Sequence, residues 1–300
     1  MKAKRIISAA LVGVMAVACL AGCGSKTEKK DDDKATIKVG SKAFSENIIV
    51  AELYSLALED AGYTVERAFS LSDQVPHESI TSGKIDMYPE YTGTGLINQL
   101  QMDISYDKDD VYQKVKDGYK EKWNIDWLES TDINDTNCYI MRKDVAEELG
   151  IKSMADAQAK SDQLIFGYIG NTMERGDYKH VEETYGKFNY KDTVQIEDQL
   201  KYTAMENGDI NFAMALSTDP TLATGEYVVL EEDPPINPPY YLTPIIRDEV
   251  LEANPDIEDI LNAVSEKLDN DVIIELVDRV DNQHEEAEDV AQDFFESECK

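Results

Sequence analysis

The stretch from Ile85 to Gly95 holds residue types that suit a small-ligand site. Its apolar run passes Met87 and reaches Pro89, which has a fixed φ and no N–H, so we expect a central strand to end there. Tyr91 and Thr94 follow beside two glycines that allow a tight turn. We therefore expect both side chains on a loop at the carboxyl end of a strand, where open α/β sheets bind ligands. The alternative is a turn whose tyrosines pack into the core.

Two basic residues follow predicted strands in the same manner. Lys42 comes after a strand at 37–39 and before a helix for which Ser45 is the expected N-cap, and Arg175 follows a strand at 164–168. A carboxylate beside Lys42 would meet a cation and the free N–H groups of a helix N-terminus. The guanidinium of Arg175 suits bidentate carboxylate binding. The alternatives are a solvent-exposed lysine and a surface salt bridge.

Two segments have the character of crossings between lobes. The first, Asp132–Asn137, is rich in turn residues. The second, Asp233–Tyr240, contains four prolines and is therefore extended and stiff. We expect the second crossing to hold Tyr240 in a fixed place; a stiff linker with a surface tyrosine is the alternative.

Strands and helices alternate along the first hundred residues. The predicted order is strand, helix, strand, helix, strand, at 37–39, 45–62, 64–69, 75–82 and from 85. Such an order argues for a parallel sheet in an α/β fold. Two further helices are predicted in the second half of the chain, one capped by Asp144 and ended by Gly150, the other at 200–207 and ended by Gly208. Three amphipathic helices close the chain, at 257–268, 272–280 and 287–294. Two α/β lobes joined by two crossings, with a ligand between them, is the economical interpretation.

Composition excludes several functional classes. The chain of 300 residues carries a formal net charge of −32, which makes nucleic acid and anionic lipid poor partners. Its three histidines are scattered and its cysteines lack metal-ligand spacing. We therefore expect no metal site, no cofactor and no Ser-His-Asp device. Cys138 and Cys299 are far apart in the sequence, and whether they are free or form a disulfide stays open at this stage.

The N-terminus has the pattern of an export signal. Residues 1–22 combine a basic start with an apolar run too short for a durable membrane span. The run ends in Leu-Ala-Gly-Cys at Cys23, which resembles a bacterial lipobox and implies cleavage before Cys23 and acylation of its thiol. Residues 23–35 are then a lipid anchor and flexible tether. The expected location is extracytoplasmic, on the outer face of the bacterial cell membrane; the alternative is an ordinary signal peptide with a chance cysteine.

Three motifs together resemble one known family. They are Gly40–Asn47, Gly83–Thr94, and Ser217–Asp219 followed by Pro238–Tyr240. With these motifs the chain resembles, over residues 36–297, the substrate-binding lipoproteins of osmoprotectant ABC importers, which bind glycine betaine, choline, carnitine and relatives. The second motif is the most specific of the three.

The resemblance implies a type II periplasmic-binding-protein fold that closes like a hinge on one small molecule. Its lobes would be residues 36–134 with 241–300, and residues 135–240. It also implies a monomer that delivers its ligand to an ABC permease and its ATPase. No catalytic role is implied.

The family's ligands explain which residues matter. A quaternary ammonium cannot donate hydrogen bonds, so aromatic faces hold it through cation–π attraction, while a carboxylate needs cations and hydroxyls. By resemblance, the cage walls are Tyr91, Tyr240 and Tyr202. Family positions that hold a betaine carboxylate correspond to Lys42, Thr94 and Arg175. Asp135 lies in the crossing that helps to shape the cage.

Two positions depart from the family pattern. Asn137 stands where a cage tyrosine is usual, and Leu216 stands where some members have another aromatic. Each lost cation–π contact is worth roughly 0.5–2 kcal/mol. Either another tyrosine substitutes, the candidates being Tyr139, Tyr168, Tyr178 and Tyr241, or the ligand differs. An amide at Asn137 favours a ligand with a hydrogen-bonding group near its cation, such as an ergothioneine-like betaine or an amino acid.

Two other classes of function are alternatives to a binding protein. An enzyme would use Glu46, Asp86 and Glu90 as acid and base, but the sequence has no nucleophile or metal motif to accompany them. A structural surface lipoprotein or adhesin would need no cleft that closes on a ligand. We therefore expect a binding protein and not an enzyme.

Overall fold

The computed structural model describes residues 34–72, 74–170, 172–174, 176–197 and 200–300, with only the backbone of residues 176–177. The predicted signal peptide at 1–22, the anchor Cys23, most of the predicted tether and Arg175 lie outside the described residues. The structure does not test the predictions that concern these residues.

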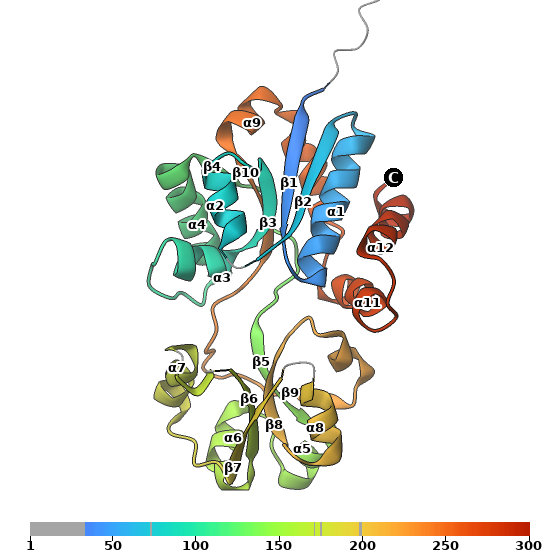
Figure 1. Cartoon of the computed structure of the whole chain (residues 1–300). Coiled ribbons are helices and arrows are strands. Elements are labelled where there is room, and N and C mark those ends of the chain that lie inside the picture. The colour runs from blue at the N-terminus through green and yellow to red at the C-terminus, as the bar shows by residue number, and fades with distance from the viewer. Residues whose placement is uncertain (1–33, 73, 171, 175, 198–199) are drawn as a thin grey trace, which may run out of the picture. The chain divides into compact units, whose positions relative to one another are not determined.

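The first sheet has five strands in the order β2-β1-β3-β10-β4 (Figure 1). Its strands are β1 (Thr36–Lys42), β2 (Thr64–Leu71), β3 (Met87–Tyr91), β4 (Ile125–Trp127) and β10 (Leu242–Arg247). β1 runs parallel to β2 and β3, as the alternating pattern predicts. β10 runs antiparallel to both β3 and β4, so the sheet is mixed and not purely parallel.

Helices cover both faces of this sheet (Figure 1). The helices of the first half of the chain are α1 (Ser45–Asp60), α2 (Val75–Thr81), the short α3 (Thr92–Thr94) and α4 (Lys108–Trp123). Those at the C-terminus are α9 (Asp248–Ala253), α10 (Asp256–Ser265), α11 (Asn270–Asp281) and α12 (Ala287–Phe294). The last three correspond to the three predicted amphipathic helices.

The second sheet also has five strands, in the order β7-β6-β8-β5-β9. Its strands are β5 (Asn137–Arg142), β6 (Ile165–Ile169), β7 (Asp192–Ile196), β8 (Phe212–Leu216) and β9 (Tyr227–Val229). The helices of this lobe are α5 (Lys143–Leu149), α6 (Met154–Ala159), α7 (Gly176–Tyr185) and α8 (Lys201–Asn207). Gly150 and Gly208 end α5 and α8 in the left-handed conformation, as expected.

Two stretches of chain connect the sheets, from β4 to β5 and from β9 to β10 (Figure 1). They pair with each other: the Asp135 N–H donates to the Tyr240 carbonyl at 3.1 Å, and the Tyr240 N–H donates to Asn134 Oδ1 at 2.7 Å. The two predicted crossings thus lie at the expected places and are fixed to one another. The exact residues at which each lobe is predicted to begin and end stay a prediction.

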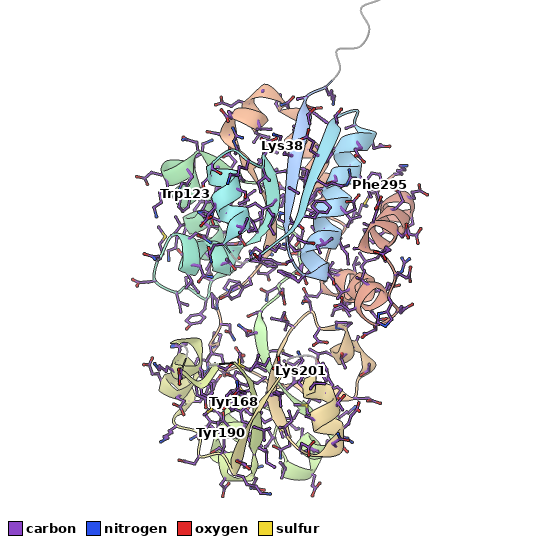
Figure 2. All side chains as sticks on the ribbon, in the orientation of Figure 1. Lys38, Trp123, Tyr168, Tyr190, Lys201 and Phe295 are labelled. Atoms are coloured by element: carbon purple, nitrogen blue, oxygen red, sulfur yellow. The ribbon has the colours of Figure 1, made fainter. Side chains whose placement is uncertain are left out.

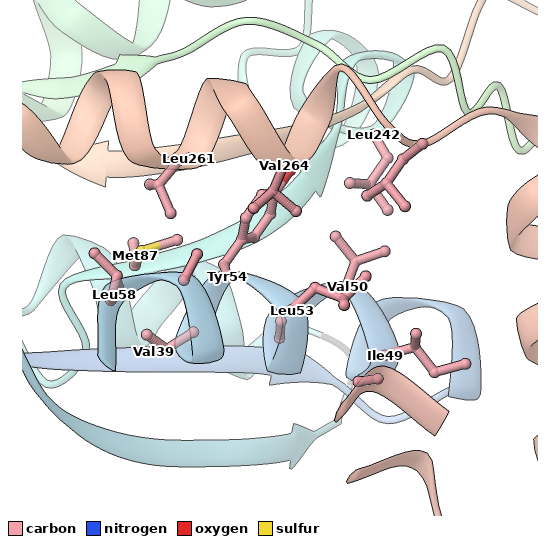
Figure 3. Packing of buried hydrophobic residues seen from close by; sticks show 14 of the residues in the cluster. Val39, Ile49, Val50, Leu53, Tyr54, Leu58, Met87, Leu242, Leu261 and Val264 are labelled. Atoms are coloured by element: carbon pink, nitrogen blue, oxygen red, sulfur yellow. The ribbon is translucent and has the colours of Figure 1, made fainter. Parts of the chain in front are cut away.

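The core of the first lobe separates into two clusters on the two faces of the sheet. Met87 and Ile246 pack on the side of α1 and α10, while Tyr88 and Ile245 pack on the side of α2 and α4. This alternation follows from the period of two along a strand. Figure 3 shows the first cluster, in which α1 side chains meet Val264 and Leu261 of α10.

The predicted end of a strand at Pro89 is wrong, because β3 continues through it to Tyr91. Pro89 lies opposite Pro244 of β10. Neither residue can donate a backbone hydrogen bond, so they form a pair at which the antiparallel ladder needs none. The Pro89 carbonyl faces the other way and accepts from Asn47 Nδ2 at 2.9 Å. Tyr91 therefore ends a buried strand instead of lying on a loop.

Two predicted helix caps are also wrong. Ser45 is the first residue of α1, Phe44 occupies the N-cap position, and the Ser45 hydroxyl donates to Asp281 of α11 instead. Asp144, expected to cap α5, lies inside its first turn and pairs with Arg142.

Cys138 and Cys299 are both free thiols. Among the described residues, no helix is long and apolar enough to cross a membrane.

We predict that Ile257→Ala, which removes a fully buried side chain from the α10–α1 packing, lowers the free energy of unfolding by about 2–5 kcal/mol. The matched control is Ile104→Ala, whose side chain is 44% exposed and whose loss is expected to change stability by less than about 0.5 kcal/mol. Urea-induced unfolding of both variants measures the difference. Equal effects of the two substitutions would contradict the packing described here.

Candidate functional site

A cavity of about 780 Å³ is lined by residues from both lobes. Its walls come from the start of α1, from the first crossing with the start of β5, from the carboxyl ends of β6 and β8, from the start of α8, and from the end of α11. Figure 2 labels two of its residues, Tyr168 of β6 and Lys201 of α8. The carboxyl ends of strands are where ligands bind in open α/β sheets.

Three of the predicted site residues line this cavity: Asp135, Asn137 and Tyr202. Four others, Lys42, Tyr91, Thr94 and Tyr240, are not among the lining residues. Arg175 lies outside the described residues. The ligand roles of all eight stay predictions, but their surroundings can be described.

Lys42 is held by a buried carboxylate. Its ammonium pairs with Glu90 and lies 4.8 Å from the centre of the Tyr91 ring. Glu90 is also satisfied by the Tyr88 hydroxyl at 2.7 Å and by the Tyr91 N–H at 2.8 Å. The positive charge of Lys42 is therefore already partnered in this structure, and a ligand carboxylate would have to share it with Glu90.

Two of the three tyrosines predicted as cage walls, Tyr91 and Tyr240, are linked through the chain at Gly93. A Cβ atom at Gly93 would lie 2.6 Å from the Tyr240 ring, so this ring packs directly on the backbone two residues after Tyr91. The Thr92 hydroxyl fixes the arrangement, because it donates to the Pro239 carbonyl at 3.0 Å and accepts from the Tyr241 N–H at 2.9 Å. Glycine is required at position 93 for this close approach. Thr94 follows in α3, half-buried.

Glu46 is a residue of the cavity wall whose importance the sequence did not reveal. It lies in the first turn of α1 and is only 4% exposed. Its Oε1 accepts from the Tyr91 hydroxyl at 2.6 Å, whereas Oε2 makes no well-formed hydrogen bond to any described residue. Burial, and then the charge of Asp135, raise the pKa of Glu46 to about 8. A glutamate at that position is also typical of an exposed helix start, and from the sequence Glu46 was a candidate only for the acid or base of an enzyme.

Asp135 is the second carboxyl group in the wall, and it is half-buried. The Thr218 hydroxyl donates to its Oδ1 at 2.9 Å. Burial raises the pKa of Asp135 to about 6, although Thr218 and the charge of Lys42 act in the opposite direction. Elsewhere in the wall, Lys201 lies 3.3 Å from Asp219 and its charge is balanced there. The described part of the cavity wall therefore contains several carboxyl groups that would attract a positively charged ligand.

The two positions that depart from the family pattern lie opposite each other. Asn137 of β5 pairs with Leu216 of β8 across an antiparallel ladder, and both line the cavity. Directly opposite residues share one face of a sheet with Cβ atoms about 4.5–5.5 Å apart. The departures thus form one patch, an amide beside an apolar side chain, instead of two separate gaps.

Aromatic rings reach the cavity from other places. Of the four tyrosines considered as substitutes, only Tyr168 lines it. Tyr139 and Tyr178 are buried in the core of the second lobe, and Tyr241 lies under the Lys108 ammonium at 3.8 Å. Phe44, which the sequence analysis did not single out, also lines the cavity, with its ring 6.0 Å from that of Tyr91. With Tyr202, the described lining therefore has three aromatic residues.

No group of three or more potential metal-ligating side chains occurs among the residues that the structure describes. The polar groups of the wall are suited to hydrogen bonding and charge pairing.

Comparison with known proteins places these observations in a family context. Residues 35–297 match the family model OpuAC, described as the substrate-binding domain of an ABC-type glycine betaine transport system. A carnitine transport binding protein, OpuCC of Listeria monocytogenes, is 28% identical over 88% of this chain and 87% of its own length. An ergothioneine transport permease and binding protein, EgtU of Helicobacter pylori, is 26% identical over 88% of this chain but only 48% of its own length.

The fold has a solved counterpart as well. The crystal structure of a glycine betaine/carnitine/choline ABC transporter protein superposes with a TM-score of 0.80, at 22% identity, over 87% of this chain and 97% of the other. This likeness confirms the two-lobed periplasmic-binding-protein fold.

The raised pKa of Glu46 should make the folding stability of the protein depend on pH. Its pKa is about 8 in the folded protein against an ordinary value of 4.5, so the folded state holds a proton that the unfolded state releases. The stabilisation that this proton gives the folded state is fully present below about pH 4.5 and is lost as pH rises through about 8. Glu46→Gln keeps the acceptor for Tyr91 and has no such loss. We expect the variant to gain stability over the wild type between about pH 5.5 and 8.5, on the order of a few kcal/mol.

Melting temperatures recorded across this pH range measure the effect. The control is Asp281→Asn, which removes an exposed carboxylate from the same cavity wall and is expected to follow the wild-type curve. Parallel curves for the wild type and Glu46→Gln would show that Glu46 is ionised throughout, contrary to our description.

Proposed function

Because this chain belongs to the OpuAC family of substrate-binding domains of ABC-type glycine betaine transport systems, we propose that it captures a small quaternary-ammonium compound of the glycine betaine, carnitine and choline class and delivers it to an ABC permease. The family is one of transport binding domains and not of enzymes. The observation that carries the proposal is the cavity between the lobes, which combines aromatic rings with buried and half-buried carboxyl groups.

The cationic head of such a ligand fits the described wall. A quaternary ammonium gains from aromatic faces and from negative charge, and it needs no hydrogen-bond acceptor. Phe44, Tyr168 and Tyr202 supply rings, and Glu46 and Asp135 supply carboxyl groups. In the family-based proposal Tyr91 and Tyr240 are further walls of the cage. The Tyr91 hydroxyl donates to Glu46 of the cavity wall, and the Tyr240 ring packs on Gly93.

The carboxylate of a betaine needs a separate partner. We assign this role to Lys42, Thr94 and Arg175, the positions that the family resemblance indicates. Lys42 is paired with Glu90, so the proposal gives the larger share of the carboxylate's binding to Arg175. Choline has no carboxylate and does not use this end of the site.

Location and assembly form part of the same proposal. We infer a lipoprotein that is exported by residues 1–22, acylated on Cys23 and held at the outer face of the cell membrane by its tether. It would act as a monomer that meets a permease and its ATPase. That no described helix can cross a membrane is compatible with this arrangement.

The patch formed by Asn137 and Leu216 supports a second candidate ligand within the same transport role. An amide beside an apolar side chain favours a ligand with a hydrogen-bonding group near its cation, such as an ergothioneine-like betaine or an amino acid. One relative of this chain is named for ergothioneine transport and binding. Loss of two cage rings at this patch would weaken a plain betaine by roughly 0.5–2 kcal/mol for each ring.

We predict that at least one compound among glycine betaine, carnitine, choline and ergothioneine raises the melting temperature of the protein. A ligand at a hundred times its Kd stabilises the folded state by about 2.7 kcal/mol. Isothermal titration then ranks the four compounds. A response to a common amino acid, with silence from all quaternary amines, would reject the osmoprotectant class. Silence from every compound would favour a structural surface lipoprotein.

A second prediction separates the two ends of the ligand. Arg175→Ala should weaken glycine betaine by about tenfold or more, since a charge-assisted bond is lost, and should change choline binding by less than about threefold. Arg142→Ala is the matched control, because Arg142 pairs with Asp144 at the surface away from the cavity. Titration of both ligands into each variant gives the ratio. Equal losses for the two ligands would defeat the assignment of Arg175.

A further inference from the structure

Two polar atoms of residues that line the cavity, Glu46 Oε2 and the Tyr202 hydroxyl oxygen, are buried without a well-formed hydrogen bond to a described residue. Glu46 is more than nine-tenths buried and lines the cavity, yet Oε2 has no well-formed hydrogen bond to any described residue. A buried polar group without a partner costs about 1–3 kcal/mol. A quaternary ammonium beside Oε2 would donate no hydrogen bond, but its positive charge would offset this cost by pairing with an ionised Glu46.

The groups around Glu46 come from four elements. Tyr91 of β3 donates to its Oε1. The charge of Asp135, in the first crossing, opposes ionisation of Glu46, and that of Lys42, in β1, favours it. Asp281 of α11 is bonded to the neighbouring Ser45.

The nearby groups do not neutralise Glu46. The Lys42 ammonium is bound to Glu90. The Thr218 hydroxyl also lies close and acts to lower the pKa of Glu46, but its well-formed hydrogen bond goes to Asp135. No described lysine or arginine forms a salt bridge with Glu46. Without a ligand, Glu46 therefore avoids two adjacent negative charges by keeping its proton.

We propose that Glu46 is a counter-ion for the positively charged head of the ligand, and that it gives up its proton to solvent when this head binds. The inference rests on the proposed function, because it needs a cationic ligand in this cavity. It adds to the predicted cage a residue that recognises charge and couples ligand capture to pH.

The direction of the coupling follows from charge balance. A cation within about 4–6 Å of a carboxyl group favours its ionised form. Binding then exchanges one proton for one positive ligand head, so the wall and its ligand together have the net charge that the wall had before binding. Because burial raises the pKa of Glu46 to about 8, cation binding competes with protonation, and the affinity is expected to rise with pH. One fully coupled proton changes Kd by about tenfold for each pH unit.

The experiment is isothermal titration of choline into the intact protein at about pH 7 in two buffers that differ in ionisation enthalpy, repeated with glycine betaine and carnitine. Choline has no group that titrates near neutral pH, so a proton released on its binding comes from the protein. We expect release of a substantial fraction of one proton, and an affinity for choline that rises several-fold between about pH 6 and 7.

Three variants identify the source of the proton. Glu46→Gln should bind without proton release and without this pH dependence, and its choline affinity above about pH 8 should fall by roughly tenfold. Asp271→Asn removes an exposed carboxylate of α11 that does not line the cavity and should keep the release. Asp135→Asn tests the neighbouring carboxyl group. Melting curves check that each variant is folded, and proton release by the wild type stands as evidence if one is not.

The outcomes separate the two proposals. Binding by the wild type without proton release, or release that persists in Glu46→Gln and disappears in Asp135→Asn, would overturn the role of Glu46 and leave the proposed function standing. Failure of choline, glycine betaine and carnitine to bind would overturn the proposed function for those ligands, and this inference with it.

Discussion

The site depends on how the protein accommodates carboxyl groups that are buried where its two lobes meet. A buried carboxylate is costly unless it is paired or protonated, and two buried carboxyl groups, Glu90 and Glu46, lie in one neighbourhood with the half-buried Asp135. Glu90 is satisfied by Lys42 and by two further donors. Asp135 is satisfied in part by Thr218. Among the described residues, Glu46 has one well-formed donor, Tyr91, and its other oxygen has no partner. The cavity lies beside the carboxyl groups that are least satisfied.

The backbone around the crossings fixes where these groups stand. The two connecting stretches are bonded to each other through Asn134, Asp135 and Tyr240. Tyr240 in turn packs on Gly93, which follows the strand that ends at Tyr91. Since Tyr91 donates to Glu46, this chain of contacts joins the crossings to the start of α1. A change at Gly93 would therefore reach the cavity although this residue does not line it.

Many helices and strands, and the family, could be predicted from the sequence. Prediction failed where tertiary contacts override local rules. Periodicity and glycine positions predicted α1, α5, α8, α10 and the first three parallel strands, and the motif at 83–94 predicted the family. Pro89 was misjudged because its partner in the sheet is also a proline, and no local rule anticipates that pairing. Ser45 was misjudged as a cap because its hydroxyl bonds to a residue far away in the sequence.

The same reasons limited prediction of the site. Asp135, Asn137 and Tyr202 were expected in it and do line the cavity. Phe44 and Glu46 lie beside Lys42 in one motif, but burial and a missing partner cannot be read from residue types. That Asn137 and Leu216 form one patch follows from strand register alone, which the sequence did not specify.

A crystal structure of the protein with bound choline tests the central claim most directly, namely that the positively charged head of the ligand lies beside the carboxyl groups of the cavity wall. We predict that the choline nitrogen lies within about 4–6 Å of Glu46 or Asp135, against the rings of Phe44, Tyr168 or Tyr202. A nitrogen bound elsewhere, with Glu46 still directed only at Tyr91, would contradict the account.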